Sequence, residues 1–292
     1  MPDAELSRKK QRVVVFGVDG VRYDTLRAAR TPRIDAIAAA GFLAPVQVNQ
    51  AGPTISGPTW ATVASGVLAT THGIFNNELY GHRLDEHPDF LTRVRQAIPG
   101  AQTFAAGDWP PLMSKASGGP IFRDADLCLS ATEHGPDSWQ PGEDRIASEA
   151  AKALGTREIT AAFIYFVGPD VVAHARGVCP EYVAAIEESD ARIGRILDAI
   201  QARPTAADEE WTVIVVTDHG HVDTGGHGGD SAEERTAWIA AAGPTVPAQA
   251  PADLEQADVH AQVLHTLGIP IAPDWNLFGR PFSRAHEPRA TG

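Results

Sequence analysis

Three apolar runs, each long enough for one strand, constrain what this chain can fold into. They are residues 13–18 (Val-Val-Val-Phe-Gly-Val), 160–167 and 211–217, and they are rich in β-branched and aromatic side chains. A continuous run of this kind predicts a strand buried on both faces of a sheet. Segments of helical periodicity separate the runs, most clearly residues 181–203, and this alternation is typical of a parallel sheet. The sequence therefore predicts an α/β fold, with a mostly parallel central sheet and helices on both faces.

Weaker signals complete this organisation. The segment from about residue 78 to 142 is richer in Gly, Pro, His and Trp, and we interpret it as a small cap inserted over the sheet edge. A chain of 292 residues has room for one large domain or two small ones. We predict a single catalytic domain, 1–292, that carries this cap. Further strands are expected at 45–49, 101–106 and 237–242, and further helices at 31–40, 58–65, 143–154 and 258–267.

Composition excludes several classes of partner. The chain has 24 Lys and Arg against 37 Asp and Glu, a formal net charge of −13. Duplex nucleic acid is therefore not expected, because its binding depends on Lys and Arg that neutralise phosphates. No segment reaches the roughly 20 apolar residues of a membrane span. Two cysteines, Cys128 and Cys179, cannot build a disulfide framework, and we expect them buried in a reducing compartment. A cytoplasmic protein that binds no membrane is predicted.

Each of the three strongest strands is followed by an aspartate. Asp19 comes directly after the first run, Asp170 three residues after the second, and Asp218 directly after the third. In an open α/β sheet, ligands bind outside the carboxyl ends of the strands, so the three carboxylates should converge there. Carboxylates this close repel one another unless cations lie between them. The pattern thus predicts a cation site at this edge.

Histidines accompany these aspartates. His174 lies four residues after Asp170, a spacing that places both on one face of a helical turn. His219 follows Asp218, and His227 lies among glycines that let the backbone bend. Oxygen and imidazole donors without thiolate suit two divalent metal ions, first of all Zn²⁺, with Mn²⁺ and others open. His221 is considered only as a residue that could support a ligand. The metal ligands predicted from these residues are Asp19, Asp170, His174, Asp218, His219 and His227.

Several motifs, in this order, resemble a known family. They are Asp19-Gly20 after the first strand, residues 53–59 (Pro-Thr-Ile-Ser-Gly-Pro-Thr) before a helix, D-x-x-x-H at 170–174, Thr-Asp-His-Gly at 217–220 and Gly-His-Gly-Gly at 226–229. The chain resembles the alkaline phosphatase superfamily, in particular its nucleotide pyrophosphatase/phosphodiesterase-like (type I phosphodiesterase) branch. The resemblance extends over nearly the whole chain.

The resemblance implies roles for individual residues. The nucleophile falls on Ser56, and the family's phosphodiesterase branch places an Asn 21 residues later, where Asn77 stands. Asn77 would donate a hydrogen bond to a phosphate oxygen. One metal would be held by Asp19, Asp218, His219 and Ser56, and the other by Asp170, His174 and His227. Thr54 and Thr59 are the nearest rivals for the nucleophile, and Asn76 for the amide.

Departures from the family's pattern limit which of its substrate specificities can be expected of this chain. The nucleophile is Ser where nucleotide phosphodiesterases usually have Thr, and His227 follows His219 after only eight residues. This spacing resembles compact members and the ethanolamine-phosphate transferases, so nucleotide specificity is not transferred. A sulfatase would need an Arg four residues after its nucleophile, and Trp60 stands there.

The predicted function is that of a metal-dependent hydrolase of small-molecule phosphoric esters, similar to phosphodiesterases and pyrophosphatases. A phosphomonoesterase with the same metals is the alternative, and it would need a basic clamp, for which Arg22, Lys115 and Arg123 are candidates. A metal-binding protein without catalysis is more remote, because no ligand or nucleophile is missing. The sequence leaves the oligomeric state open. Substrate-selecting aromatic side chains are expected in the cap: Tyr80, Phe90, Trp109 and Trp139.

Overall fold

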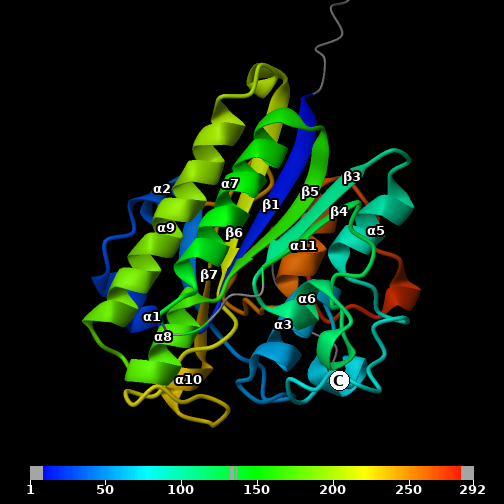
Figure 1. The fold of residues 1–292 in the computed structure, drawn as a ribbon. Helices are drawn as coiled ribbons and strands as arrows, with labels where there is room; N and C mark the ends of the chain where they lie inside the picture. The colour runs from blue at the N-terminus through cyan, green and yellow to red at the C-terminus, as the bar shows by residue number, and fades with distance from the viewer. Residues whose placement is uncertain (1–8, 132–134, 136, 284–292) are drawn as a thin grey trace, which may run out of the picture.

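One sheet of seven strands organises the part of the chain that the structure describes (Figure 1). The structure is a computed structural model, and it describes residues 9–131, 135 and 137–283. The strand order is β2-β7-β6-β1-β5-β3-β4. The strands are β1 (Lys10–Val18), β2 (Phe42–Gln47), β3 (Gln102–Gly107), β4 (Leu127–Ser130), β5 (Ile159–Phe166), β6 (Glu209–Val216) and β7 (Thr236–Ala242).

The sheet is mostly parallel. β1 lies at its centre and pairs in parallel with β5 and β6, and β3 pairs in parallel with β5 and β4. Only β7 runs against its two neighbours, β6 and β2. The three apolar runs thus form the three central strands, which explains why they are apolar on both faces. The predicted fold class is confirmed.

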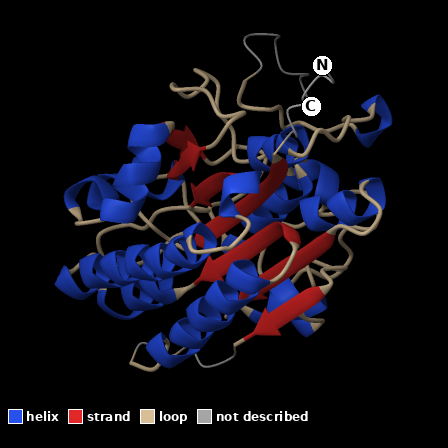
Figure 2. Cartoon of the chain, turned by 90° about the horizontal axis from the view of Figure 1, so that it is seen from above, coloured by secondary structure: helices blue, strands red, loops and turns tan. Residues whose placement is uncertain are grey.

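Helices cover both faces of this sheet (Figures 1 and 2). One layer contains α1, α2, α7, α8 and α9, and the other contains α3, α5, α6 and α11. The helices are α1 (Tyr23–Ala28), α2 (Pro32–Ala40), α3 (Ser56–Ser65), α4 (Ala69–His72), α5 (Phe90–Ala97), α6 (Pro110–Met113), α7 (Gln140–Thr156), α8 (Gly168–Arg176), α9 (Pro180–Gln201), α10 (Ala232–Arg235) and α11 (Asp258–Thr266). Short 3₁₀ turns occupy Ala116–Gly118, Ala206–Asp208 and Pro273–Trp275.

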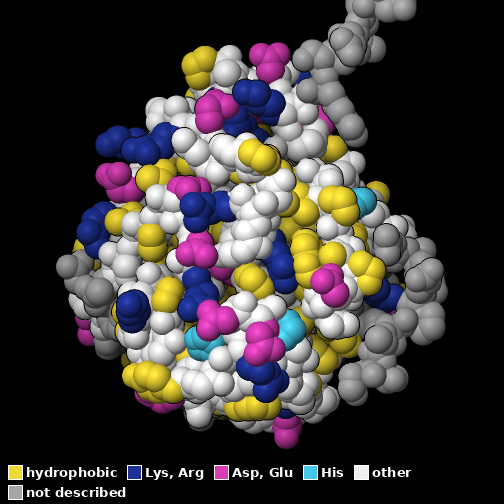
Figure 3. Space-filling view, turned by 90° about the vertical axis from the view of Figure 1, so that its right-hand side faces the viewer, with side chains coloured by type: hydrophobic (Ala, Val, Ile, Leu, Met, Phe, Trp, Pro, Cys, Tyr) yellow, Lys and Arg dark blue, Asp and Glu magenta, His cyan; other side chains and the backbone are white. Residues whose placement is uncertain are grey.

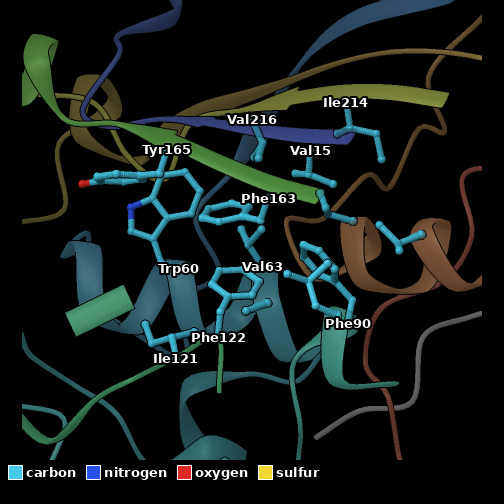
Figure 4. Packing of buried hydrophobic residues seen from close by; sticks show 14 of the residues in the cluster. Val15, Trp60, Val63, Phe90, Ile121, Phe122, Phe163, Tyr165, Ile214 and Val216 are labelled. Carbon is cyan, nitrogen blue, oxygen red and sulfur yellow. The ribbon is translucent and has the colours of Figure 1, made fainter. Parts of the chain in front are cut away.

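Alternate residues of β1 feed the two cores. Val13 and Val15 join the cluster under α3, α5 and α11, whereas Val14 and Phe16 join the cluster under α7 and α9. All four are fully buried, as the alternation of side chains along a strand requires. Figure 4 shows the first cluster, in which Trp60 of α3 lies against Phe163 of β5.

Gly17 brings α3 against the end of β1. A Cβ at this position would lie 2.6 Å from the Trp60 ring, closer than real Cβ contacts allow. The absence of a side chain therefore lets the indole cover the strand. The first turn of α3 is thereby held near the carboxyl end of β1.

The segment from 78 to 142, expected as a cap over the sheet edge, lies partly within the sheet. β3 pairs with β5, and β4 pairs with β3 as the edge strand. The strand expected at 101–106 is confirmed as β3, while β4 is short and only partly apolar, so no periodicity marked it. The assignment of 1–292 to a single catalytic domain stays a prediction.

Two further expectations are corrected or bounded by the structure. Cys128 is exposed on the edge strand β4 and Cys179 is partly exposed before α9, so the expectation that both are buried was wrong. The strand expected at 45–49 begins earlier, as β2. Among the described residues, no helix is both long and apolar enough to cross a membrane.

Charge is distributed over the surface rather than gathered. On the face shown in Figure 3, acidic and basic side chains are interspersed. Several basic side chains are paired, for example Arg95 with Asp126 at 3.0 Å. This face therefore offers no extended basic surface of the kind that phosphate backbones require.

Asp190 of α9 holds the start of α2. Its carboxylate accepts hydrogen bonds from the backbone N–H groups of Arg33 and Ile34, at 3.1 and 2.8 Å. These N–H groups belong to the first turn of a helix and have no partner within it. A buried carboxylate from a neighbouring helix thus acts in place of a local cap.

Replacement of Asp190 should therefore destabilise the fold. We expect Asp190→Ala to lower the free energy of unfolding by about 1–3 kcal/mol, because one buried and one partly buried donor lose their acceptor. Asp198→Ala is the matched control, since Asp198 pairs with the Arg33 side chain at the surface and such pairs contribute about 0–1 kcal/mol. Urea unfolding of both variants measures the difference. Equal midpoints for the two variants would contradict this account.

Candidate metal centre and active site

The predicted ligands gather at the carboxyl end of the central strands. Asp19 directly follows β1, and Asp218 lies two residues beyond the end of β6. Asp170 and His174 lie on α8, which begins two residues after the end of β5. Figure 1 shows α8 and α3 at this same end of the sheet. Residues that are far apart in the sequence are thus brought together by the parallel strands.

Asp19, Asp218 and His219 form one group of donor atoms. The Nε2 atom of His219 lies 3.8 Å from Asp19 Oδ1 and 3.2 Å from Asp218 Oδ2. All three side chains are buried, and their donor atoms lie within 4.8 Å of one another. Ser56 Oγ lies 3.4 Å from the same Nε2 atom. The four residues that the resemblance assigned to one metal are therefore neighbours.

Asp170, His174 and His227 form a second group. The Nε2 atoms of His174 and His227 lie 3.5 and 3.7 Å from Asp170 Oδ1, and 2.9 Å from each other. The rings of His219 and His227 stack at a centroid distance of 3.9 Å. The two groups are thus adjacent, as a two-metal site requires.

The chemistry of these donors fits divalent cations. Asp19 Oδ1, Asp170 Oδ1 and Asp218 Oδ2 are buried and accept no hydrogen bond from any described residue. A buried carboxylate oxygen without a partner is strongly unfavourable unless a cation takes that place. Three such oxygens at one point, together with imidazole nitrogens, match the ligands of zinc and similar ions.

Backbone carbonyls fix the tautomers of two ligands. His227 Nδ1 lies 2.7 Å from the carbonyl oxygen of Thr54, and His219 Nδ1 lies 3.1 Å from that of Gly220. A carbonyl only accepts, so Nδ1 carries the proton in each ring. Both Nε2 atoms therefore present a lone pair to the cluster, the arrangement typical of metal-binding histidines.

Trp60 and Tyr165 hold Asp19 in place. The Trp60 indole donates a 2.9 Å hydrogen bond to Asp19 Oδ2, and the Tyr165 hydroxyl donates to the same oxygen. Figure 4 shows the indole nitrogen and the hydroxyl pointing to the same side of the aromatic cluster. With Oδ2 held, Oδ1 faces His219. Sequence reasoning missed both residues, although Trp60 lies one helical turn after Ser56 on the same helix face.

Burial changes the protonation of the cluster. Desolvation raises the pKa of Asp218 to about 8 and raises that of Asp19, with the neighbouring carboxylates adding to both effects. Burial lowers the pKa of His219 and, less strongly, that of His227. Burial also acts to raise the pKa of Asp170, but the imidazoles of His221, His219 and His174 together outweigh it and bring the value to about 2. At neutral pH the imidazoles of His219 and His227 are thus neutral, with lone pairs available to a cation.

Ser56 is the first residue of α3, where N–H groups without partners and the helix dipole favour an anion. Ile55 precedes it as the N-cap, so Ser56 does not cap this helix. The rivals serve the backbone: Thr54 Oγ1 donates to the carbonyl of Gly229 and accepts from Gly228 N–H, and Thr59 Oγ1 donates to that of Ile55.

Asn77 lies beside the nucleophile. Its Oδ1 accepts a 2.8 Å hydrogen bond from the N–H of Gly57, the residue after Ser56. Asn76 instead accepts from the N–H of Glu78 and closes a local turn. Of the two amides, Asn77 is therefore the one that is hydrogen-bonded to the residue next to Ser56. Its Nδ2 hydrogens remain as donors.

Other candidate residues are engaged elsewhere. Arg22 pairs with Asp24 and Asp223, and Arg123 pairs with Asp85. Phe90 and Trp139 are buried in the two cores, so the expectation that they select the substrate was wrong. Tyr80 is 71% exposed and Phe75 is 50% exposed, and Trp109 is half-buried. Sequence reasoning also gave no ligand role to His221, which is fully buried inside the cluster.

The raised pKa of Asp218 predicts that cation binding releases a proton. Below about pH 8 the cation-free carboxyl holds its proton, and a cation needs the carboxylate, so affinity should rise from about pH 6 and level off above about pH 8. Titration calorimetry of Zn²⁺ binding in two buffers of different ionisation enthalpy measures the released proton. Affinity that is constant across this range, with no buffer dependence, would contradict the protonated state of Asp218.

Comparisons with known proteins agree with the fold. A GPI ethanolamine phosphate transferase 2 of Saccharomyces cerevisiae is 30% identical over 117 residues, which are 40% of this chain and 13% of that protein. The chain thus matches only a small part of this curated relative. Among solved structures, a 2-O GAG sulfatase has a TM-score of 0.72 at 14% identity, covering 95% of this chain and 76% of that one. Murine ectonucleotide pyrophosphatase/phosphodiesterase 5 has a TM-score of 0.65 at 17% identity, covering 90% and 96%.

The model of one family extends over most of the chain. It is the model of type I phosphodiesterase/nucleotide pyrophosphatase, and it matches residues 13–265. This range includes every predicted site residue, from Asp19 to His227. The chain therefore belongs to the type I phosphodiesterase/nucleotide pyrophosphatase family, a family of hydrolases that act on phosphoric esters.

Proposed function

We propose that this chain hydrolyses small phosphoric esters, diesters in preference to monoesters, with Ser56 as nucleophile and two divalent cations, most simply Zn²⁺. The observation that carries the proposal is the position of Ser56 Oγ at the start of α3, 3.4 Å from His219 Nε2. Around it lie three buried carboxylates, each with an oxygen that lacks a hydrogen-bond partner.

The residues divide between two cations as follows. Asp19, Asp218, His219 and Ser56 would hold one, and Asp170, His174 and His227 the other. When bound, two such ions supply Lewis acidity, lower the pKa of the Ser56 hydroxyl and neutralise the phosphate. Trp60 and Tyr165 keep the ligand oxygen of Asp19 aimed at this point.

Ser56 carries the covalent step. Its Oγ attacks phosphorus in line, a bond forms between Oγ and phosphorus, and the bond from phosphorus to the leaving group breaks. The hydroxyl proton passes to solvent, and the leaving oxygen takes a proton from solvent. A water molecule then attacks phosphorus, a bond forms between its oxygen and phosphorus, the bond from Oγ to phosphorus breaks, and Oγ regains a proton as the phosphate leaves. The N-terminal N–H groups of α3 stabilise the phosphate charge during both steps.

Asn77 supports the preference for diesters. A neutral amide donor stabilises one non-bridging oxygen without calling for the second negative charge of a monoester. Of the three basic residues that could recognise that additional charge, Arg22 and Arg123 are paired with Asp24, Asp223 and Asp85, and Lys115 is exposed. The murine relative whose inactive variant binds AMP shares the fold at 18% identity, which does not transfer its ligand.

Replacement of the nucleophile should abolish turnover. We expect Ser56→Ala to lose all measurable hydrolysis of bis-p-nitrophenyl phosphate because the neighbouring hydroxyls of Thr54 and Thr59 are engaged with backbone groups. Ser65→Ala is the matched control, since Ser65 is a buried serine of the same helix whose hydroxyl donates to the carbonyl of Ala61. Mass spectrometry of the acid-quenched enzyme should locate the phosphoryl group on Ser56.

Turnover near the wild-type rate in Ser56→Ala, with inactivity of Thr54→Ala or Thr59→Ala instead, would move the role of nucleophile. Loss of activity in Ser65→Ala as well would show that the helix, and not the hydroxyl, is responsible.

Removal of the amide donor should slow the diester reaction. We expect Asn77→Ala to lower kcat for the diester by about 10²–10³, the effect of losing one donor to the developing charge. Asn76→Ala is the control, since that side chain closes only a turn. Comparing kcat/KM for bis-p-nitrophenyl phosphate and p-nitrophenyl phosphate tests the preference. A tenfold preference for the monoester, with Asn77→Ala silent, would favour a phosphomonoesterase.

A further inference from the structure

We propose that His221 is a further ligand of the cation held by Asp170, so that this ion takes an imidazole beyond those of His174 and His227. The proposal rests on the two-cation site proposed above. It concerns a residue outside the D-x-x-x-H pair and the Gly-rich histidine motif. Three independent observations carry it: the absence of hydrogen-bond partners for the ring, the position of its Nε2 atom, and the space left by Gly20.

The ring of His221 is buried without hydrogen bonds. The residue is fully buried, and neither Nδ1 nor Nε2 has a hydrogen-bond partner among the described residues. His72 shows the contrast, because its Nε2 lies 3.1 Å from Thr62 Oγ1 and its Nδ1 accepts from the N–H of Ile74. Buried polar atoms in folded proteins are almost always paired. A cation at Nε2 would provide the missing partner.

The position of Nε2 is that of a ligand. It lies 2.9 Å from Asp170 Oδ1, but the two atoms lack the geometry of a hydrogen bond. Bonds of about 2.0–2.1 Å in a tetrahedral site place two ligand atoms about 3.3 Å apart, close to this separation. The donor atoms of Asp170, His219 and His221 also lie within 4.8 Å of one another.

The ring lies beside the other three imidazoles of the cluster. Its centroid is 5.1 Å from that of His227, 5.3 Å from that of His174 and 5.6 Å from that of His219. Each of these rings presents a nitrogen to the cations of the proposed site. His221 therefore adjoins all three of these imidazoles.

Gly20 leaves the space in which His221 Nε2 and Asp170 Oδ1 approach each other. A Cβ at position 20 would lie 2.5 Å from His221 Nε2 and 2.9 Å from Asp170 Oδ1, where no atom fits. The backbone here is left-handed, with φ of +65°, which glycine adopts most readily. The N–H of Gly20 donates to Asp218 Oδ1, and its carbonyl accepts from the hydroxyl of Tyr182. Hydrogen bonds thus hold the N–H and the carbonyl of Gly20. The side of this residue that lacks a Cβ faces His221 Nε2 and Asp170 Oδ1.

A purely supporting role for His221 fits these observations less well. If Nε2 carried a proton toward Asp170, the two atoms should form a hydrogen bond, but at 2.9 Å they lack the geometry of one. A metal bond at Nε2 instead leaves the proton on Nδ1 and employs the lone pair that faces Asp170. The two roles differ in what a glutamine at this position can replace, because an amide donates a hydrogen bond but is a poor zinc ligand.

The test measures zinc binding, not turnover. Wild-type protein, His221→Ala, His221→Gln and the control His260→Gln are titrated with Zn²⁺ against a competing chelator. We expect wild type and control to bind two ions, and both His221 variants to bind one of them at least tenfold more weakly. Removing a residue that merely orients a ligand typically weakens binding 10–100-fold, so a ligand should lose no less. Co²⁺-loaded protein should show a changed d–d spectrum in both variants.

The outcomes separate this inference from the proposed function. Two ions in wild type, with unchanged affinity and spectrum in His221→Gln, would overturn the ligand role and leave the two-cation site intact. Weak binding in His221→Ala that Gln restores would assign His221 to positioning Asp170 and also overturn it. Fewer than two ions in wild type would contradict the proposed function itself. Circular dichroism of the chelated variants confirms that each remains folded.

Discussion

The repulsion among three buried carboxylates is the constraint on which the site depends. Asp19, Asp170 and Asp218 converge because β1, β5 and β6 are parallel neighbours whose carboxyl ends meet at one edge. Each carboxylate has an oxygen without a hydrogen-bond partner among the described residues. The fold can bring these charges together only where protons or cations compensate them. This crowding raises the pKa of Asp218. It also accounts for the imidazoles that surround the carboxylates.

The features that could be predicted from the sequence are those that depend on local patterns of residues. Buried strands are recognisable because both faces are apolar, and the residues that follow them lie at the edge by topology alone. Asp19 and Asp218 were therefore placed correctly, and His174 was placed beside Asp170 by the helical spacing. The edge strand β4 was missed because a short strand with partly exposed side chains has no continuous apolar pattern.

The contacts that support the metal ligands could not be predicted from the sequence, because they join residues that are far apart in the chain. Tyr165 and Asp19 are 146 residues apart, and only the pairing of β5 with β1 makes them neighbours. Sequence reasoning assigned His221 only a supporting role, since its position beside Asp170 depends on a glycine 201 residues earlier. Phe90 and Trp139 were misplaced for the same reason, because composition does not show which aromatic residues of a segment face the core.

The nucleophile and one carboxylate are coupled through a single helix. Ser56 and Trp60 lie one turn apart on α3, so the residue that supports Asp19 and the residue proposed to attack phosphorus move as one unit. That unit sits over Gly17, where any Cβ would meet the indole at 2.6 Å. A glycine inside a strand weakens the strand. At this position the loss is compensated, because the close approach of Trp60 fixes the distance between Ser56 and the carboxyl end of β1. The residue at position 17 of the central strand is therefore explained by the position of α3 at the site and not by the stability of the sheet.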